Sequence, residues 1–244
     1  MVRRFFVERL SKVMTLKEAF RYFTHLVWPQ RCPVCGMVGV SHCPGCLAAA
    51  SDPLPPFCLC CGGRYGASCC DDSVPCYAAA VHDGAARAFL LRLKYRGARD
   101  LGVPVGMLMA NVFPRVEADA IVPVPLHRGS DRGFNQCELI AEGISRVTGV
   151  PVVRDALEWR GRSGAQTGKR GLERRALPLD SFRCSDSVRG LRVLLVDDVF
   201  TTGGTLRSAR HAVKTAGGDV TAAFVWSRRL HSGENPNAFD EDLV

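Results

Sequence analysis

The chain has 244 residues, with 32 lysines and arginines against 24 aspartates and glutamates, which gives a formal net charge of +8. This length is enough for a full α/β core with a small additional domain. No segment reaches the roughly 18 consecutive apolar residues of a membrane span, so we expect no membrane-spanning helix. The excess of basic residues favours polyanionic partners, either a nucleotide phosphate or a nucleic acid.

The first segment, residues 1–30, is basic and amphipathic. The charged residues Glu8, Lys12, Lys17 and Glu18 interrupt the apolar core that a secretion signal requires. We therefore expect an amphipathic N-terminal helix on a cytoplasmic protein.

Cysteine is concentrated in one part of the chain, because ten of the twelve cysteines fall between Cys32 and Cys76. The stretch "CPVCGMVGVSHCPGC" has the spacing C-x2-C-x7-C-x2-C. Two cysteines with two residues between them form a knuckle, and two knuckles complete a tetrahedral zinc site. The sequence thus predicts a structural zinc site whose ligands are Cys32, Cys35, Cys43 and Cys46.

A near-repeat follows in "CLCCGGRYGASCCDDSVPC", where the same x2 and x7 spacings recur at Cys58, Cys61 and Cys69. Strict repetition puts Asp72 in the fourth position, whereas the preference of zinc for thiolates favours Cys76 or Cys70, and we predict Cys76. One zinc ion bound by knuckles from both halves is an alternative, so one or two structural Zn²⁺ ions are expected. Disulfides fit less well, because we expect no secretion signal.

An α/β unit is expected to begin near residues 76–80, where cysteine usage stops. Apolar residues at helical spacing in the stretch 83–102 predict a helix with one buried face. The residues of that face are Ala86, Phe89, Leu90 and Leu93. The stretch "ADAIVPVP" predicts a buried strand that ends at Pro123 and Pro125. A helix follows in "RGFNQCELIAEGISRVTG", with Gly149 as its stop, and "PVVRDALEWR" predicts another strand.

The next segment, residues 161–177, has no periodicity and, with the preceding Arg160, is rich in cations. These cations are Arg160, Arg162, Lys169, Arg170, Arg174 and Arg175. A strand at 193–196, a helix over about 205–216 and a strand at 219–226 complete the chain. Because strands alternate with helices, the sequence predicts an α/β fold with a parallel sheet.

The stretch "VLLVDDVFTTGGTL", residues 193–206, combines three features that point to one kind of site. Its uniformly aliphatic start is typical of a parallel strand covered on both faces. Asp197 and Asp198 then stand at the carboxyl end of that strand, where ligands bind in open α/β sheets. The threonine and glycine residues that follow lead into a helix start, which favours an anion. The stretch therefore predicts a phosphate-binding loop with acidic neighbours.

This stretch resembles the phosphoribosyl pyrophosphate (PRPP) binding motif of type I phosphoribosyltransferases. Together with the cysteine module, "LKYRG", "VPVPLHRGSDRGFNQ" and a later Q-x7-RR pattern, it resembles the ComF family, which is linked to competence for DNA uptake. One departure is Leu177, where the family usually has asparagine. The resemblance covers the chain from about Val27 and implies a zinc-ribbon module at 31–77 and a phosphoribosyltransferase-like parallel sheet flanked by helices at 78–230. The amphipathic helix is expected at 1–30 and a tail at 231–244.

The same resemblance implies the roles of individual residues. Asp197 and Asp198 would act on the ribose hydroxyls and stabilise positive charge near the ring. Residues implied to bind PRPP around its 5-phosphate are Val199, Thr201, Thr202, Gly203, Gly204 and Thr205. Residues implied to bind the pyrophosphate are Pro125, His127, Arg128, Arg132 and Lys94. Mg²⁺ is expected with the pyrophosphate, and the cation-rich loop would be a hood that excludes water.

The resulting hypothesis is an enzyme, a phosphoribosyltransferase that acts on PRPP or a related phosphoribosyl nucleotide and has a ComF-like role in DNA uptake. The alternative is a non-catalytic protein that binds single-stranded DNA or senses nucleotides, with competence-type helicase or processing proteins as partners. A P-loop NTPase is excluded, because Gly164 and Gly168 bracket only three residues and Arg170 replaces the required serine or threonine. No residue in the sequence identifies the acceptor.

Overall fold

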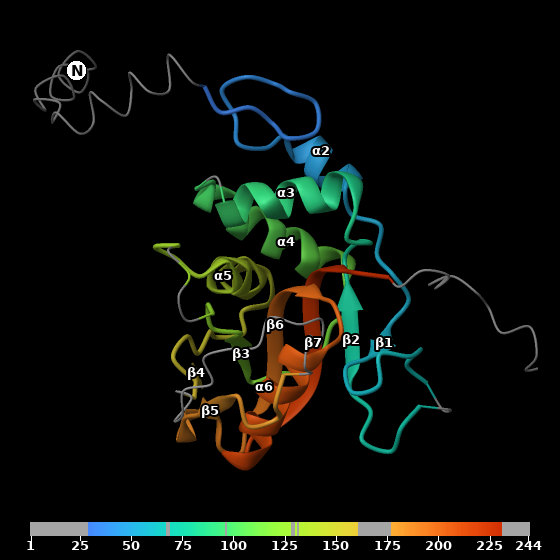
Figure 1. The fold of residues 1–244 in the computed structure, drawn as a ribbon, viewed down its shortest axis with the longest axis vertical. Helices are drawn as coiled ribbons and strands as arrows, with labels where there is room; N and C mark the ends of the chain where they lie inside the picture. The colour runs from blue at the N-terminus through green and yellow to red at the C-terminus, as the bar shows by residue number, and fades with distance from the viewer. Residues whose placement is uncertain are drawn as a thin grey trace, which may run out of the picture.

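The computed structural model describes residues 29–66, 69–95, 97–127, 130, 132–160 and 177–230 (Figure 1). The predicted helix at 1–30 is therefore outside the described residues except for its last two positions. The cation-rich loop, apart from Arg160 and Leu177, and the predicted tail also lie outside them. No helix in the described ranges is both long and apolar enough to cross a membrane.

A five-stranded sheet with the order β1-β2-β7-β6-β3 forms the centre of the fold. Its strands in this order are β1 (Phe57–Cys58), β2 (Pro75–Ala78), β7 (Asp219–Arg228), β6 (Arg192–Phe200) and β3 (Ala120–Pro123). Only β1 is antiparallel to its neighbour, and the other pairs are parallel. The predicted parallel sheet is confirmed.

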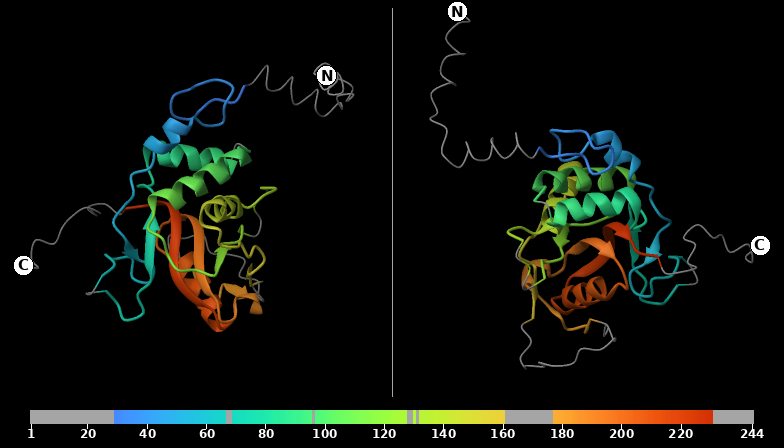
Figure 2. Two further views of the ribbon diagram at one scale, coloured as in Figure 1. Left: turned by 180° about the vertical axis from the view of Figure 1, so that it is seen from behind. Right: turned by 45° about the horizontal axis from the view of Figure 1, so that its top comes forward.

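The aliphatic run in β6 is buried because helices cover both faces of the sheet. Leu194 and Val196 pack into the core formed with α3 (Gly84–Tyr95), α4 (Gly102–Val112) and α5 (Gln136–Thr148). Val193 and Leu195 pack into the opposite core, formed with α6 (Gly204–Thr215). Figures 1 and 2 show α6 on the other side of the strands from α3 and α4.

Two of these helices agree closely with their sequence patterns. The four predicted residues of α3 are its buried residues. Helix α5 begins after Asn135, whose side chain accepts a hydrogen bond from the backbone N–H of Cys137, and it ends at Gly149 with a φ of 77°. Both ends therefore follow ordinary capping chemistry.

The stretch 151–160, predicted as one strand, is divided between two sheets. Val152 makes a single parallel bridge to Ile121 of β3. The following β4 (Leu157–Trp159) pairs antiparallel with β5 (Phe182–Cys184) in a separate two-stranded sheet. The prediction of one continuous strand is wrong, because a turn at Arg154 and Asp155 redirects the chain.

The two halves of the cysteine module occupy different places. The first half, with α2 (Pro44–Ala49), lies beside α3 at the end of the molecule remote from α6 (Figure 1). The second half contributes β1 and β2, and β2 pairs with β7 from Cys76↔Ala223 to Ala78↔Val225. Strand β2 crosses the predicted boundary at residue 77, so the second half is built into the central sheet.

Helices α4 and α5 pack so closely that two glycines meet. A Cβ atom on Gly106 would lie only 1.9 Å from the carbonyl oxygen of Ile140 and 2.9 Å from the Cα of Gly143. Only glycine permits this approach of two backbones.

We expect Gly106→Ala to lower the free energy of unfolding by about 2 kcal/mol or more, because the added methyl group must push two helices apart. Urea denaturation followed by circular dichroism measures the change. Gly45→Ala in α2 is the matched control, because a Cβ atom there would meet no atom within 4 Å. Equal stability of Gly106→Ala and Gly45→Ala would contradict the packing described.

Candidate functional site

The predicted functional residues gather at the carboxyl end of the sheet. Strand β6 extends further than predicted, through Asp197 and Asp198 to Phe200. The loop 201–203 follows directly and leads into α6. The two carboxylates and the phosphate-loop residues therefore come from one continuous strand-loop-helix segment.

Asp198, on strand β6, is buried and accepts hydrogen bonds from side chains on two helices. Its Oδ1 atom accepts a hydrogen bond from Nζ of Lys94 on α3 at 2.7 Å. Its Oδ2 atom accepts one from Nε2 of Gln136 on α5 at 2.5 Å. Lys94, predicted to bind pyrophosphate, is thus placed beside the acidic pair and compensates its charge.

Asp197 is also buried, with an exposed fraction of 8%. One of its oxygens accepts the backbone N–H of Asp198 at 2.8 Å, and the thiol of Cys137 lies 3.5 Å from the same oxygen. Burial raises the pKa of Asp197 to about 7, and the negative charge of Asp198 adds to this shift. Its carboxyl group therefore holds a proton at far higher pH than an exposed aspartate.

The phosphate-loop residues adopt a conformation that requires glycine. Gly203 has a φ of 75°, and a Cβ atom on it would lie 2.7 Å from the ring of Phe200. The guanidinium of Arg207 donates a hydrogen bond to the carbonyl oxygen of Thr202 at 2.8 Å. Thr201 and Thr202 are exposed, and Thr205 lies in the first turn of α6. The first turn of a helix offers backbone N–H groups to an anion, so this loop can hold a phosphate.

Leu177, the departure from the family pattern, lies against this loop. A Cβ atom on Gly204 would lie 3.3 Å from the Cβ of Leu177. An apolar side chain therefore stands next to the start of α6.

The residues predicted to bind pyrophosphate are only partly brought together. Nη1 of Arg132 donates to Oε1 of Gln136 at 2.9 Å, which connects Arg132 to Asp198 through one side chain. The ring of His127 packs edge-on against the ring of Trp159, with the two ring centroids 5.0 Å apart. The indole N–H of Trp159 donates a hydrogen bond to the carbonyl oxygen of Pro125. Arg128 lies outside the described residues.

Sequence reasoning missed the contacts of Gln136 and Trp159. Gln136 entered the sequence analysis only as part of the stretches "VPVPLHRGSDRGFNQ" and "RGFNQCELIAEGISRVTG", whereas its side-chain amide donates a hydrogen bond to Asp198. Trp159 lies within the stretch "PVVRDALEWR" that was predicted only as a strand, and its contact with Pro125 spans 34 residues. No local signal in the sequence predicts either contact.

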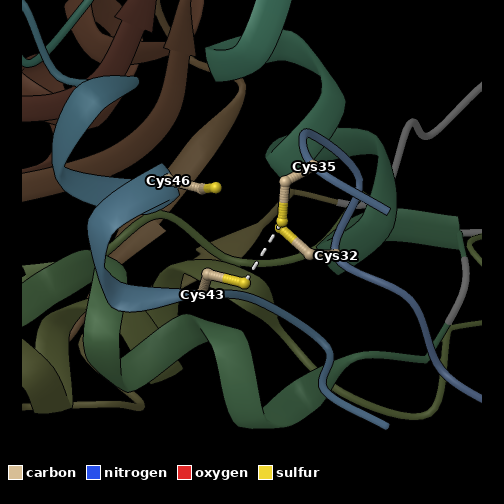
Figure 3. A group of neighbouring side chains, drawn as sticks. All are labelled: Cys32, Cys35, Cys43 and Cys46. Atoms are coloured by element: carbon tan, nitrogen blue, oxygen red, sulfur yellow. Dashed lines mark hydrogen bonds between the residues drawn. The ribbon is translucent and has the colours of Figure 1, made fainter. Parts of the chain in front are cut away.

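The first cysteine cluster has the predicted four members. Figure 3 shows the side chains of Cys32, Cys35, Cys43 and Cys46 directed toward one another. Their sulfur atoms all lie within 4.8 Å of one another, and those of Cys35 and Cys43 are 3.4 Å apart. Sulfurs around a tetrahedral zinc ion are separated by about 3.8 Å, so the four thiols fit the ion.

The second cluster consists of Cys58, Cys61, Cys69 and Cys70. The prediction of Cys76 as its fourth member is corrected to Cys70. The physical reason is that Cys76 lies in β2, where it is fully buried and pairs with Ala223 of the central sheet. Two sulfur pairs across the cluster, Cys58 with Cys70 and Cys61 with Cys69, are each 3.6 Å apart.

Each cluster draws its four thiols from its own half of the module, so the arrangement fits two zinc ions rather than one shared ion. Burial opposes ionisation of Cys32 and of Cys58. Backbone N–H groups directed at each sulfur outweigh this effect and lower both pKa values to about 6. One thiol per cluster is therefore ready to ionise, as a zinc ligand must.

Asp72, the strict-repeat candidate for the fourth ligand, instead attaches the second cluster to α6. Both of its carboxylate oxygens accept hydrogen bonds from Arg210, each at 2.6 Å, and Lys214 adds a third contact. Arg207 also donates to the carbonyl oxygen of Cys60 at 3.3 Å. The second cluster is thus docked on the helix that starts at the phosphate loop.

Comparisons with known proteins agree with this geometry. A family model described as "Phosphoribosyl transferase domain" matches residues 135–242. Adenine phosphoribosyltransferase of Saccharopolyspora erythraea is 32% identical over 139 residues, which cover 49% of this chain and 70% of that protein. Sheet, loop and comparisons together define a type I phosphoribosyltransferase fold carrying an N-terminal cysteine-rich module.

Two further relatives are competence proteins. Competence protein ComFC of Bacillus subtilis is 31% identical over 133 residues, which cover 52% of this chain and 53% of that protein. Competence protein F of Haemophilus influenzae is 33% identical over 113 residues, covering 44% and 48% respectively. The chain thus spans about half the length of these two relatives. These relatives and the matched domain support assignment of the chain to the ComF family.

We expect full-length protein to carry two zinc ions, and Cys70→Ser to carry one, because the second cluster then lacks a thiolate. Metal analysis by mass spectrometry, expressed per chain, measures this. Cys60→Ser is the control, since Cys60 is adjacent in the same segment but outside the cluster. Two zinc ions retained in Cys70→Ser would show that another residue completes the site.

The raised pKa of Asp197 predicts a pH dependence of stability. The folded protein keeps this proton up to about pH 7, whereas the unfolded chain releases it near pH 4. Between these values the folded state binds more protons, so the free energy of unfolding falls as the pH rises. We expect Asp197→Asn to reduce this fall, by on the order of 2 kcal/mol between pH 5 and pH 8. Urea unfolding at both pH values measures it, with exposed Asp155→Asn as control, and an unchanged pH dependence in Asp197→Asn would refute the assignment.

Proposed function

We propose that the protein binds PRPP together with Mg²⁺ and transfers its phosphoribosyl group to an acceptor or releases it to water. The observation that carries the proposal is the continuous segment in which β6 runs through Asp197 and Asp198 into loop 201–203 and helix α6. In this segment, two acidic side chains and a phosphate-binding loop stand at the end of one buried strand. In a complex with PRPP, the loop would bind the 5-phosphate and the acidic side chains would bind the ribose.

The loop supports the proposal through its backbone. The 5-phosphate would accept hydrogen bonds from the N–H groups at the start of α6 and from the hydroxyls of Thr201, Thr202 and Thr205. Gly203 lets the backbone turn sharply before α6, and the hydrogen bond from Arg207 to the carbonyl oxygen of Thr202 fixes the loop.

The acidic pair would bind the ribose. Carboxylate oxygens accept hydrogen bonds from hydroxyl groups and stabilise positive charge that develops at the sugar ring. Lys94 and Gln136 keep the Asp198 carboxylate in one orientation before any ligand arrives. Such preorganisation avoids the cost of reorienting charges during the reaction.

Asp197 and Asp198 are also hard oxygen donors of the kind that Mg²⁺ prefers. When bound to PRPP, Mg²⁺ would neutralise charge on the leaving pyrophosphate. Arg132, connected to Asp198 through Gln136, would meet the same group from the protein side. His127 and Arg128 of the predicted pyrophosphate loop would contribute next to it.

The proposed transfer replaces one bond at C1 of the ribose with another. The bond between C1 of the ribose and a pyrophosphate oxygen breaks, and pyrophosphate leaves with the bonding electron pair. The acceptor supplies a lone pair for the new bond to C1 and loses a proton. Water is the acceptor if the group is released.

A role in DNA uptake is part of the proposal, because two relatives are named competence proteins. Direct binding of single-stranded DNA stays a prediction. Arg162, Lys169 and Arg170 of the cation-rich loop, which would contact the DNA backbone, lie outside the described residues. Tyr95 offers a ring on which a base could stack, because it is 68% exposed, and the guanidinium of Arg132 lies 5.1 Å from its ring centroid.

We expect the double variant Asp197→Asn with Asp198→Asn to bind PRPP and Mg²⁺ at least about tenfold more weakly, because neutral amides lose the charge-assisted contacts. Isothermal titration calorimetry on the zinc-loaded full chain measures this, and circular dichroism checks the fold. Asp155→Asn, which changes an exposed carboxylate outside the loop 201–203 and the acidic pair, is the matched control. Undiminished affinity in the double variant would overturn the assignment of these residues.

Turnover is tested separately from binding. The wild-type protein is incubated with PRPP, Mg²⁺ and a panel of bases and amines, and pyrophosphate release is measured. Release that depends on one acceptor identifies a transferase, and release without an acceptor identifies hydrolysis. PRPP binding without any release would refute turnover on this panel and leave a binding protein.

A further inference from the structure

A cavity of about 300 Å³ lies between the second cysteine cluster and the phosphate loop. One wall is the knuckle at residues 61–63, and another is Phe200 with Thr201 and Thr202. The third wall is formed by Arg228 and Arg229, at the carboxyl end of β7. The cavity therefore opens at the end of the sheet where α/β proteins bind ligands, beside the proposed PRPP site.

Arg228 brings a buried positive charge to this cavity, with an exposed fraction of only 9%. Its guanidinium lies 4.1 Å from the ring centroid of Phe57, and its Nη2 atom donates to the carbonyl oxygen of Gly62 at 2.8 Å. These contacts fix the cation against the knuckle.

Arg229 adds a second cation whose backbone is fixed and whose side chain is exposed. Its N–H donates to the carbonyl oxygen of Phe200 at 2.8 Å, which ties the ends of β6 and β7 together. Two arginines and two threonines thus line the cavity, and none of its lining residues is acidic. Guanidinium groups match the planar, bidentate geometry of carboxylate and phosphate oxygens.

We propose that this cavity is a second ligand site, which binds the carboxylate or phosphate group of a small organic anion. The anion lies against Arg228 and Arg229, and its apolar part faces Phe200. The site is distinct from the loop site because its cations come from the end of β7 rather than from the residues that open α6. Thr201 and Thr202 stand between the two, so both ligands can be bound as neighbours.

Glycine amide signals in NMR spectra test the proposal on the zinc-loaded full chain labelled with ¹⁵N-glycine. Gly62 and Gly63 report on the cavity, and Gly203 and Gly204 report on the loop. The probes are inorganic phosphate in one titration and succinate in the other. We expect at least one probe to shift the signals of Gly62 and Gly63 in a saturable manner. A response to phosphate assigns the site to phosphate groups, and a response to succinate assigns it to carboxylates.

Arg229→Gln should weaken this response at least about tenfold, because one charge-assisted contact is lost. The response of Gly203 and Gly204 to phosphate should stay unchanged in the same variant. Arg115→Gln is the matched control, since Arg115 is an exposed arginine after α4. The proposal is overturned if neither anion shifts Gly62 and Gly63, or if Arg229→Gln responds as the wild type does. Failure of the loop site would appear separately, as signals of Gly203 and Gly204 that do not move.

Discussion

The contacts of the Asp198 carboxylate hold together the part of the molecule on which its function depends. This buried group ends the aliphatic core of β6 and receives hydrogen bonds from α3 through Lys94 and from α5 through Gln136. Removing one partner of a buried ion pair typically costs about 3–5 kcal/mol, so the three elements are strongly coupled. The need to compensate one charge therefore places two helices around the proposed ribose site and sets the positions of Arg132 and Asp197.

The phosphate loop is held in a comparable way from the other face of the sheet. Arg207 joins the carbonyl oxygens of Thr202 and Cys60, and Arg210 and Asp72 fasten the cysteine segment to α6. Arg228 connects Gly62 to the aromatic pair of Phe57 and Phe200. The segment that carries the second cysteine cluster thus packs against the phosphate loop and α6 and supports both.

Local patterns predicted those features that depend on neighbours in sequence. The helix α3, the stop at Gly149, the buried strand before Asp197 and the first cysteine cluster all follow from spacing or capping chemistry. Helix α4 was missed, because its sequence "GVPVGMLMANV" is apolar on nearly every side and has no clear period. Cys76 was misassigned because its pairing with Ala223 spans the whole α/β unit. The bond from Gln136 to Asp198 joins residues 62 positions apart, which no single-sequence pattern encodes.

The contribution of the cysteine module to the central sheet also bears on self-association through the sheet edge. Strand β1 has only two residues, and together with the bridge from Phe57 to Arg64 it covers the free side of β2. An uncovered strand presents unpaired N–H and C=O groups that template pairing with other chains. Cys58 belongs to β1 and to the second cysteine cluster. A metal ion held by that cluster would therefore fix the strand that covers this edge of the sheet, and oxidation of its thiols would loosen the edge before it affected the loop 201–203.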